Sequence, residues 1–373
     1  MNIERIELQH LQMPYLTPFE ASFGRMDGRR FVLVSVYGEG AVGHAESVAM
    51  EGPYYIEETN ETVSYMLRAY LIPLLLRSQV NRPEDVSALF EPIRRHNMAK
   101  AALEGAVWDL YAKQKGVSLA AALGGRKEEI EVGVSIGIEP TVDEVLEKVE
   151  RFLEEGYKKI KVKIKPGFDL QPIEAIRKRF GDEVPLMADA NSAYRMDQMD
   201  RLKELDHFQL MMIEQPLAHD DIVDHAQLQK QLRTPICLDE SIHSAEDARK
   251  AIELGSCRII NIKIGRVGGL TESRKIHDLC EERQIPVWCG GMFESGVGRA
   301  HNIAVTSLPN FTLPGDTSAS NRYWQEDIVS PEVKLARPGI LQVPAGPGIG
   351  YELDQRRVDK FLIKKEIFRP NEM

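Results

Sequence analysis

The sequence predicts an α/β fold in which a closed parallel barrel follows an α+β region. The first third reads as a group of strands followed by a group of helices, the order typical of an α+β domain. From about residue 130 the pattern changes to strict alternation of apolar strands and amphipathic helices. Five charged residues recur near strand ends, with gaps of 26, 25, 25 and 24 residues: Lys163, Asp189, Glu214, Asp239 and Lys263. Such a repeat suits one strand, one helix and their loops.

The strands and helices of the first third follow from residue spacing. Residues 1–50 are predicted to form strands, because apolar and polar residues alternate at the N-terminus and 31–38 is rich in β-formers. Residues 57–80 and 84–123 are predicted to be helical. The clearest helical spacing covers 99–116, with Gly116 as a stop.

The barrel is predicted to begin with a strand at 131–138 and a helix at 141–156, capped by Thr141. A helix at 244–255 is typical of the later connections. The remaining strands are expected at 159–164, 185–190, 210–215, 235–240, 258–263, 286–292 and 310–316. Eight such units favour a closed barrel. The alternative, an open doubly wound sheet, would not draw its site from five consecutive strands.

Side chains alternate between the two faces of a strand, so the spacing predicts which residues point into the barrel. Ile160, Val162 and Ile164 are expected to face the helices, which turns Lys161 and Lys163 inward. The same count turns inward Met187, Asp189, Asn191, Met212, Glu214, Cys237, Asp239, Asn261 and Lys263. Every strand gives the same phase, and the carboxyl ends of barrel strands are where such enzymes hold their active sites.

Three carboxylates on consecutive strands, about 4.8 Å apart, can converge on one ion. An oxygen-only set, Asp189, Glu214 and Asp239, favours Mg²⁺ or Mn²⁺. The alternative is a set of buried ion pairs that only hold the barrel together, although such pairs add little stability. Lys163 and Lys263 flank the trio.

A cation bound to a substrate carboxylate makes the neighbouring C–H bond more acidic, and a neutral lysine can then remove the proton. Nearby cations lower a lysine pKa. Lys161 could do this to Lys163, and Arg266 to Lys263; the alternative for Arg266 is an ion-paired arginine at the rim.

Composition excludes several classes of function. The formal net charge of −10 disfavours nucleic acid and anionic membranes as partners. No run of 18 apolar residues or signal-like segment is present. The four cysteines show no paired spacing and are expected to be reduced, which predicts a cytoplasmic protein.

Several segments together resemble the enolase superfamily, in its muconate-lactonizing-enzyme subgroup. They are IKVKIKPG (160–167), MADANSAY (187–194), IEQPL (213–217), CLDESI (237–242), NIKIGRVGG (261–269), WCGGMFESGVGRA (288–300) and LPGDTSAS (313–320). The resemblance covers essentially the whole chain. It implies an α+β capping domain at 1–125, a (β/α)7β TIM-like barrel at 126–320, and a tail at 321–373 that packs back on the capping domain.

The resemblance also implies roles for individual residues. Lys163 and Lys263 become the acid/base pair, and Asp189, Glu214 and Asp239 the ligands of Mg²⁺. A loop at 17–24 resembles the family's mobile specificity loop. The substrate is expected to contact Phe19, Phe23, Met50, Ser135, Lys161, Asn191, Gly291, Met292 and Phe293. Asp316 either supports the site or belongs to a loop turn, and the sequence does not decide between these.

Within the family the chain is most similar to o-succinylbenzoate synthases that also act as N-succinylamino acid racemases. The expected reaction is dehydration of 2-succinyl-6-hydroxy-2,4-cyclohexadiene-1-carboxylate in menaquinone synthesis, with racemisation as a second activity. A dedicated N-acylamino acid racemase or dipeptide epimerase is the alternative, and a non-catalytic binding barrel a remote one. The expected partner is a small carboxylate substrate, in a homo-oligomer.

Overall fold

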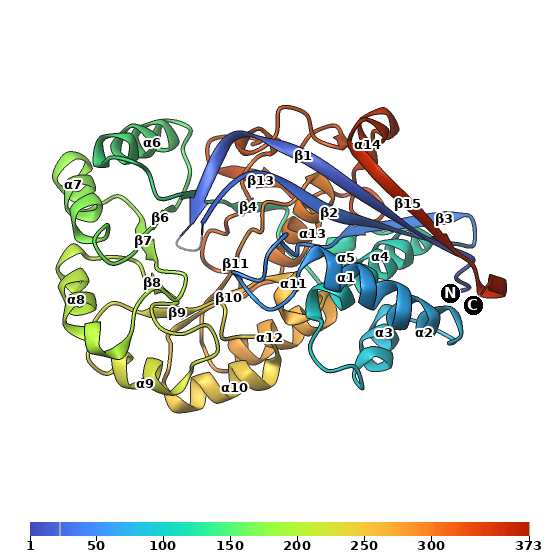
Figure 1. The fold of residues 1–373 in the computed structure, drawn as a ribbon, viewed down its shortest axis with the longest axis horizontal. Coiled ribbons are helices and arrows are strands. Elements are labelled where there is room, and N and C mark those ends of the chain that lie inside the picture. The colour runs from blue at the N-terminus through green and yellow to red at the C-terminus, as the bar shows by residue number, and fades with distance from the viewer. Residues whose placement is uncertain (22–23, 373) are drawn as a thin grey trace.

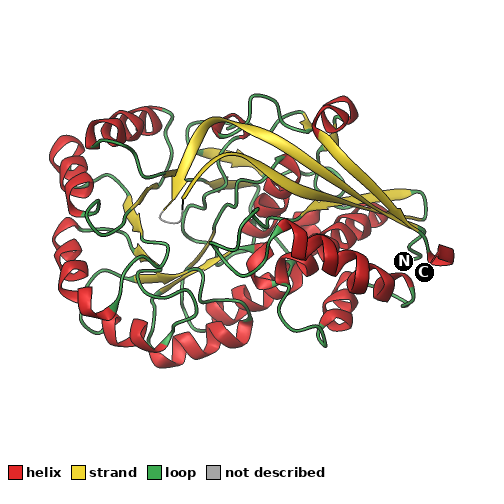
Figure 2. Ribbon diagram, viewed as in Figure 1, coloured by secondary structure: helices red, strands yellow, loops and turns green. Residues whose placement is uncertain are grey.

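The computed structural model describes residues 1–21 and 24–372, and its N-terminal part is an antiparallel sheet packed against helices (Figure 1, Figure 2). The strands are β1 (Arg5–Ala21), β2 (Gly24–Gly38), β3 (Ala41–Glu46) and β15 (Leu362–Phe368), in the order β15-β1-β2-β3. The last strand of the chain therefore pairs with the first. Val34 and Val36 face the core shared with the capping helices, whereas Phe31 and Leu33 face the core shared with the barrel.

The capping helices are more broken than the sequence predicted. The expected helix at 57–80 consists of α1 (Asn60–Met66), a π-helical turn η1 (Leu67–Leu71) and α2 (Ile72–Leu76). The expected helical region at 84–123 consists of α3 (Pro83–Phe90), α4 (Asn97–Lys115) and α5 (Leu119–Leu123). His96 and Gly116 adopt left-handed backbone angles at the two ends of α4, and such angles end a helix.

Seven parallel strands curl into the barrel in the order in which they occur in the chain. They are β5 (Val134–Ile136), β6 (Ile160–Lys163), β7 (Leu186–Asp189), β8 (Ile213–Glu214), β9 (Ile236–Leu238), β10 (Ile259–Ile262) and β11 (Val287–Cys289). The fold is thus the predicted enolase-like one, a curled parallel sheet with a capping domain, and the open doubly wound alternative is wrong.

The expected eighth strand at 310–316 is not a regular strand. The segment contains Pro314, which has no N–H to donate, and isolated backbone hydrogen bonds join it to its neighbours. Gly133 N donates to Gly315 O on the β5 side (2.6 Å), and Asp316 N donates to Cys289 O on the β11 side (2.9 Å). These bonds close the barrel between β11 and β5. The expected first strand is also split, since β4 (Glu129–Glu131) pairs instead with β13 (Ile340–Gln342).

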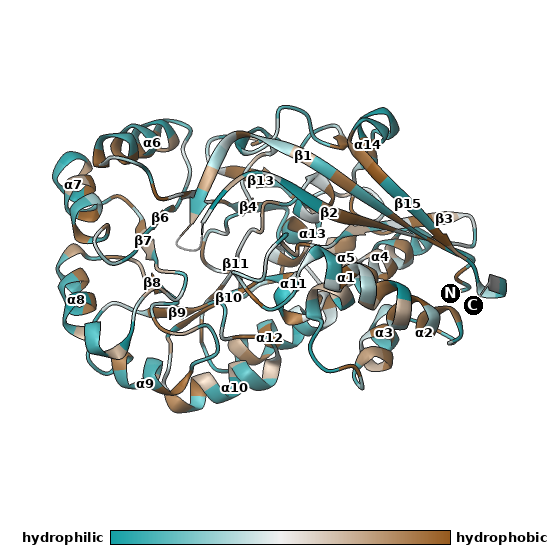
Figure 3. Cartoon of the chain, viewed as in Figure 1, coloured by the Kyte–Doolittle hydropathy of each residue, from teal (hydrophilic) through white to brown (hydrophobic). Residues whose placement is uncertain are grey.

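Helices follow the barrel strands (Figure 1), and most of them carry both hydrophilic and hydrophobic residues, as Figure 3 shows. They are α6 (Val142–Glu154), α7 (Leu170–Phe180), α8 (Met199–Glu204), α9 (Val223–Gln229), α10 (Ala245–Leu254), α11 (Ile264–Val267), α12 (Leu270–Glu282) and α13 (Gly296–Thr306). The predicted cap of α6 is confirmed, because Thr141 Oγ1 accepts a hydrogen bond from Glu144 N (3.2 Å).

The remaining elements are short. The tail contains β12 (Val329–Ser330), β14 (Glu352–Leu353) and α14 (Gln355–Phe361), and 3₁₀ turns occur at Met196–Gln198, Leu205–Phe208, Ser320–Arg322 and Pro370–Glu372. Within the described part of the chain, no helix has both the length and the apolar character needed to cross a membrane. All four cysteines are unpaired and buried.

Candidate active site

Strand register brings the predicted charged residues to one end of the barrel. Lys163 lies opposite Asp189, and Asp189 opposite Glu214, in consecutive parallel strands. Asp239 follows β9, and Lys263 follows β10. All five residues are at most 8% exposed. The inward phase is confirmed on the apolar residues too, since Met187, Met212 and Cys237 pack together inside the barrel around Trp288.

Amines and carboxylates alternate across this end of the barrel. Lys163 Nζ lies 2.6 Å from Asp189 Oδ2. Lys161 Nζ lies 3.2 Å from Asp189 Oδ2 and 3.2 Å from Glu214 Oε2, so one ammonium group links two carboxylates. Asn261 Nδ2 donates to the other oxygen of Glu214 (2.7 Å). Asp189 and Glu214 therefore already surround a positive charge.

Asp239 has a different set of partners. Its Oδ2 is 2.8 Å from Lys263 Nζ, and its Oδ1 accepts from Tyr55 OH (2.9 Å) and from Arg266 Nη1. Cys237 is the residue in register with Glu214, and Asp239 lies two residues further along the chain. Asp239 is therefore closer to the capping domain, where it contacts Tyr55. The structure thus does not bring all three carboxylates together. Among the described residues, the one triad of possible ligands within 4.8 Å is His277, Asp278 and Glu281, on the outer helix α12.

Arg266 is fully buried rather than at the rim, and it reaches Lys263 through the shared carboxylate of Asp239. Its guanidinium also donates to the carbonyl oxygens of Ile242 (2.6 Å) and Asn261. Lys263 immediately precedes α11, and the first turn of that helix brings Arg266 into contact with Asp239.

The two flanking lysines differ electrostatically. Burial lowers the pKa of Lys163, and the positive charges of Lys161 and Lys263 add to this effect against Asp189. Burial also acts to lower the pKa of Lys263, but Tyr55 and nearby glutamates outweigh it, so that the pKa is raised. Burial favours the neutral form of Asp189, yet its two lysine partners hold its pKa well below the usual range. The expected lowering therefore occurs at Lys163 and not at Lys263.

A small cavity of about 30 Å³ lies directly beside the two lysines. The predicted contact residues that line it are Phe19, Met50, Ser135, Lys161, Asn191, Gly291, Met292 and Phe293. Phe23 lies outside the described residues. The sequence prediction missed Tyr55 and Tyr323, which also line the cavity, and Asp316, whose role it left open, lines the cavity as well. Tyr55 and Tyr323 come from irregular segments in which no spacing marks a residue as inward-facing.

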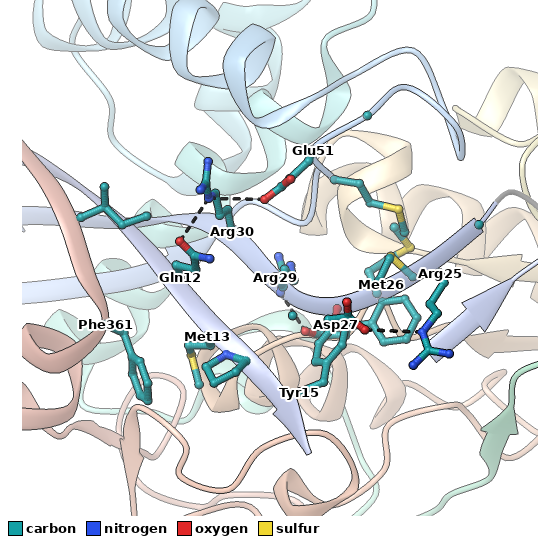
Figure 4. A pocket seen from close by; sticks show the side chains of 18 of the residues that line it. Gln12, Met13, Tyr15, Arg25, Met26, Asp27, Arg29, Arg30, Glu51 and Phe361 are labelled. Atoms are coloured by element: carbon teal, nitrogen blue, oxygen red, sulfur yellow. Dashed lines mark hydrogen bonds and ion pairs between the residues drawn. The ribbon is translucent and has the colours of Figure 1, made fainter. Parts of the chain in front are cut away.

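A much larger cavity, about 960 Å³, opens outside the small one (Figure 4). It shares Met50, Met292 and Phe293 with the inner cavity, so these side chains form the wall between the two. Two ion pairs lie on its lining, Arg25 with Asp27 (3.5 Å) and Arg30 with Glu51 (3.4 Å), as Figure 4 shows. Neither Lys163 nor Lys263 lines it, whereas both line the inner cavity.

Comparisons with known proteins agree with the fold. Residues 5–124 match the mandelate racemase / muconate lactonizing enzyme N-terminal domain, and residues 144–357 match the enolase C-terminal domain-like family. An o-succinylbenzoate synthase of Geobacillus stearothermophilus is 59% identical, covering 99% of this chain and 98% of the relative. An N-succinylamino acid racemase of Thermus thermophilus is 49% identical, covering 95% of each.

Solved structures place the whole chain on the same fold. An enolase-superfamily member from Listeria innocua has a TM-score of 0.96 at 45% identity and covers 100% of both chains. A dipeptide epimerase from Cytophaga hutchinsonii, complexed with Mg and the dipeptide D-Ala-L-Val, has a TM-score of 0.90 at 25% identity, covering 98% of this chain and 100% of that one. The chain therefore belongs to the enolase superfamily, with the N-terminal domain of the mandelate racemase / muconate lactonizing enzyme group.

Proposed function

We propose that the protein is a divalent-cation-dependent o-succinylbenzoate synthase that also racemises N-succinylamino acids. The observation that carries the proposal is the placement of Lys163 and Lys263 on either side of a buried row of carboxylates, beside one small cavity. Both reactions begin with removal of a proton from the carbon next to a carboxylate, so one pair of bases serves both. The relatives named above carry the same two activities.

The carboxylates fit a divalent cation. Asp189 and Glu214 hold the Lys161 ammonium between them, which shows that their oxygens favour a positive charge at that point. Hard oxygen donors without histidine or cysteine suit Mg²⁺, with Mn²⁺ or another divalent ion as substitutes. Asp189, Glu214 and Asp239 would hold it, and Asp239 would have to exchange one of its present partners. When bound, the cation supplies stabilisation of the negative charge that develops on the substrate carboxylate.

The lysines move the protons. In racemisation, one lysine takes the proton from the α-carbon and the other delivers a proton to the opposite face. In the synthase reaction, one lysine takes the ring proton and returns a proton to the departing hydroxyl, so that water leaves and the ring becomes aromatic. The second lysine then remains protonated and stabilises the intermediate by its charge.

The inner cavity has room for little more than a water molecule, so the substrate must displace side chains on entering. The wall of Met50, Met292 and Phe293 separates it from the large outer cavity, which gives the substrate a route inward. Phe19 and Phe293 meet edge to face, with ring centroids 4.8 Å apart, and would pack against the apolar part of the substrate.

Two incubations test the proposal. The purified protein with Mg²⁺ is given N-succinylphenylalanine in D₂O, and separately the cyclohexadiene carboxylate. We expect loss of the α-proton signal with racemisation in the first, and appearance of the aromatic product in the second. Racemisation without aromatisation would favour a dedicated racemase, and failure of both would reject the proposal. The expected homo-oligomer and cytoplasmic location stay predictions, and light scattering measures the former.

A further inference from the structure

Asp316, whose role the sequence left open, lies between Lys161 of β6 and Lys159, the residue just before that strand. Its Oδ2 is 2.5 Å from Lys161 Nζ, and its Oδ1 is 3.4 Å from Lys159 Nζ. Both lysines point inward from the same face of the strand, two residues apart. The backbone of Asp316 is fixed by its bond to Cys289 O, at the point where the irregular eighth segment closes the barrel. Strand and closing segment therefore form one charged cluster.

Lys159 is an unusual partner, because it is completely buried and takes no part in the proposed reaction. Its ammonium group lies 3.3 Å from the ring centroid of Trp288, and among the described residues it has no hydrogen-bond acceptor. Burying such a charge costs free energy that an apolar residue would not cost. Stability alone therefore does not explain the Lys159–Asp316 pair. Its position next to Lys161 indicates a role in positioning a neighbouring side chain.

The neighbouring side chain that Asp316 contacts is Lys161. Three carboxylates surround that ammonium, and Asp316 is the nearest, whereas Asp189 and Glu214 are each 3.2 Å away. We propose that Asp316, itself anchored by Lys159, is a positioning residue that retains Lys161 and so leaves Asp189 and Glu214 free to bind the cation. The inference rests on the proposed function, since it concerns the same cation. Without Asp316, the Lys161 ammonium would be shared by Asp189 and Glu214 alone and would compete with the cation for them.

Direct binding of Mn²⁺, followed by electron paramagnetic resonance of the free ion, tests this without reference to turnover. We expect Asp316→Asn to weaken Mn²⁺ binding by roughly 10- to 100-fold, the range typical of residues that support a ligand. Unchanged affinity in Asp316→Asn would overturn the inference. If the wild-type protein bound no Mn²⁺, the proposed function and this inference would both fail. If the wild-type protein bound Mn²⁺ and Asp316→Asn bound it equally well, only this inference would fail.

A double-mutant cycle with Lys161→Met distinguishes positioning of Lys161 by Asp316 from direct electrostatic attraction between Asp316 and the cation. If Asp316 acts through Lys161, Asp316→Asn should change Mn²⁺ affinity little once Lys161 is absent. A loss of the same size in both backgrounds would instead mean that the carboxylate attracts the cation directly, and the inference would be wrong.

Two further variants control for folding. Lys159→Met with Asp316→Asn removes the buried cation and its partner together, and should weaken Mn²⁺ binding as the single variant does even if Asp316→Asn folds poorly. Asp327→Asn is the matched control, because Asp327 is also buried but accepts from Gly296 N (2.8 Å) and Ser320 Oγ (2.5 Å), outside the inner cavity. Asp327→Asn should lower thermal stability and leave Mn²⁺ affinity unchanged. Equal losses of Mn²⁺ affinity in Asp327→Asn and Asp316→Asn would mean that misfolding causes the loss, and the inference would be wrong.

Discussion

The two walls of the active site are built on different principles. On the barrel side, charged residues of neighbouring strands pair at short range, as Lys163 does with Asp189 at 2.6 Å. On the capping side, aromatic and aliphatic side chains from distant segments pack together, as Phe19 does with Tyr323 at a ring-centroid distance of 6.4 Å. Directional contacts fix atoms to within a fraction of an ångström, whereas apolar packing tolerates rearrangement. Under the proposed function, the chemistry then belongs to the barrel and the choice of substrate to the cap.

Tyr55 joins the two walls. It belongs to the loop that leaves β3, yet its hydroxyl donates to Asp239 and its ring lies 4.4 Å from Lys263 Nζ. Through Tyr55 the capping domain therefore contacts the carboxylates of the barrel directly. Substitutions in either domain can test the contrast between the two walls.

Removal of either flanking lysine should give the largest effect. We expect Lys163→Ala and Lys263→Ala each to lower the rate of both reactions by roughly 10²- to 10⁴-fold, the usual contribution of a general acid or base. Each variant should still exchange the α-proton of one enantiomer of N-succinylphenylalanine in D₂O, because one base remains. NMR of the two separate enantiomers measures this. Racemisation at the wild-type rate by either single variant would contradict the two-base assignment.

Removal of the cation should come next. Dialysis against EDTA is expected to abolish activity, and added Mg²⁺ to restore it. Because a ligand that binds only the folded state stabilises it, Mg²⁺ at about 100 times its Kd should add about 2.7 kcal/mol to the free energy of unfolding. Thermal unfolding across a Mg²⁺ titration checks this, with Glu214→Gln as the variant in which the shift should vanish. An equal shift in that variant would place the ion elsewhere.

Arg266→Gln should act more weakly and through pH. Asp239 now pairs with both Arg266 and Lys263; without the arginine, its negative charge acts on Lys263 alone and raises the pKa of that lysine. We expect the acidic limb of the pH–rate profile to move to higher pH, with a loss of rate at neutral pH smaller than that of the lysine variants. Arg266→Lys, which keeps the charge, should restore the limb in part. An unmoved limb in Arg266→Gln would reject the role.

The same contrast explains what could be predicted from the sequence. The barrel charges were found because strand alternation and a regular repeat give each of them a phase, and Lys161 and Asp189 lie inward as that phase requires. The split of the capping helices at His96 was not found, because a left-handed angle at a histidine leaves no reliable mark in composition.

Contacts between residues far apart in the sequence were harder still to predict. Arg266 was expected beside Lys263 because it follows that lysine by three residues, but the helical turn between them brings it to Asp239 instead. Tyr55 and Tyr323 reach the site from irregular segments, where no period exists to be read. Only the packing of the two domains selects these residues, and packing is a property of the whole chain.

Substitutions on the capping wall should change selectivity more than rate. Phe19→Ala or Met50→Ala removes apolar contact in the inner cavity, worth about 1–3 kcal/mol, and should raise KM by roughly 10-fold while kcat falls less. The ranking of N-succinylamino acids with different side chains should change as well. Steady-state kinetics on such a series measures both. Phe361→Ala is the control, since Phe361 lines only the outer cavity; an equal effect there would mean that the substrate sits further out.

The smallest effect tests the cap alone, through His44 on β3. Burial lowers the pKa of His44 to about 4, with Lys113 and His301 adding to the shift and Asp109 and Glu7 opposing it. The unfolded chain takes up a proton near pH 6.5 and the folded one only near 4, so this contribution is present above pH 6.5 and is lost as pH falls toward 4. The loss is at most about 3 kcal/mol. In His44→Gln, which retains a partner for Ser35 Oγ, now 2.9 Å from the His44 ring, thermal stability should fall less steeply over this range. Activity at neutral pH should not change, because His44 does not line the inner cavity; a parallel loss of activity would show that the two walls are not separable.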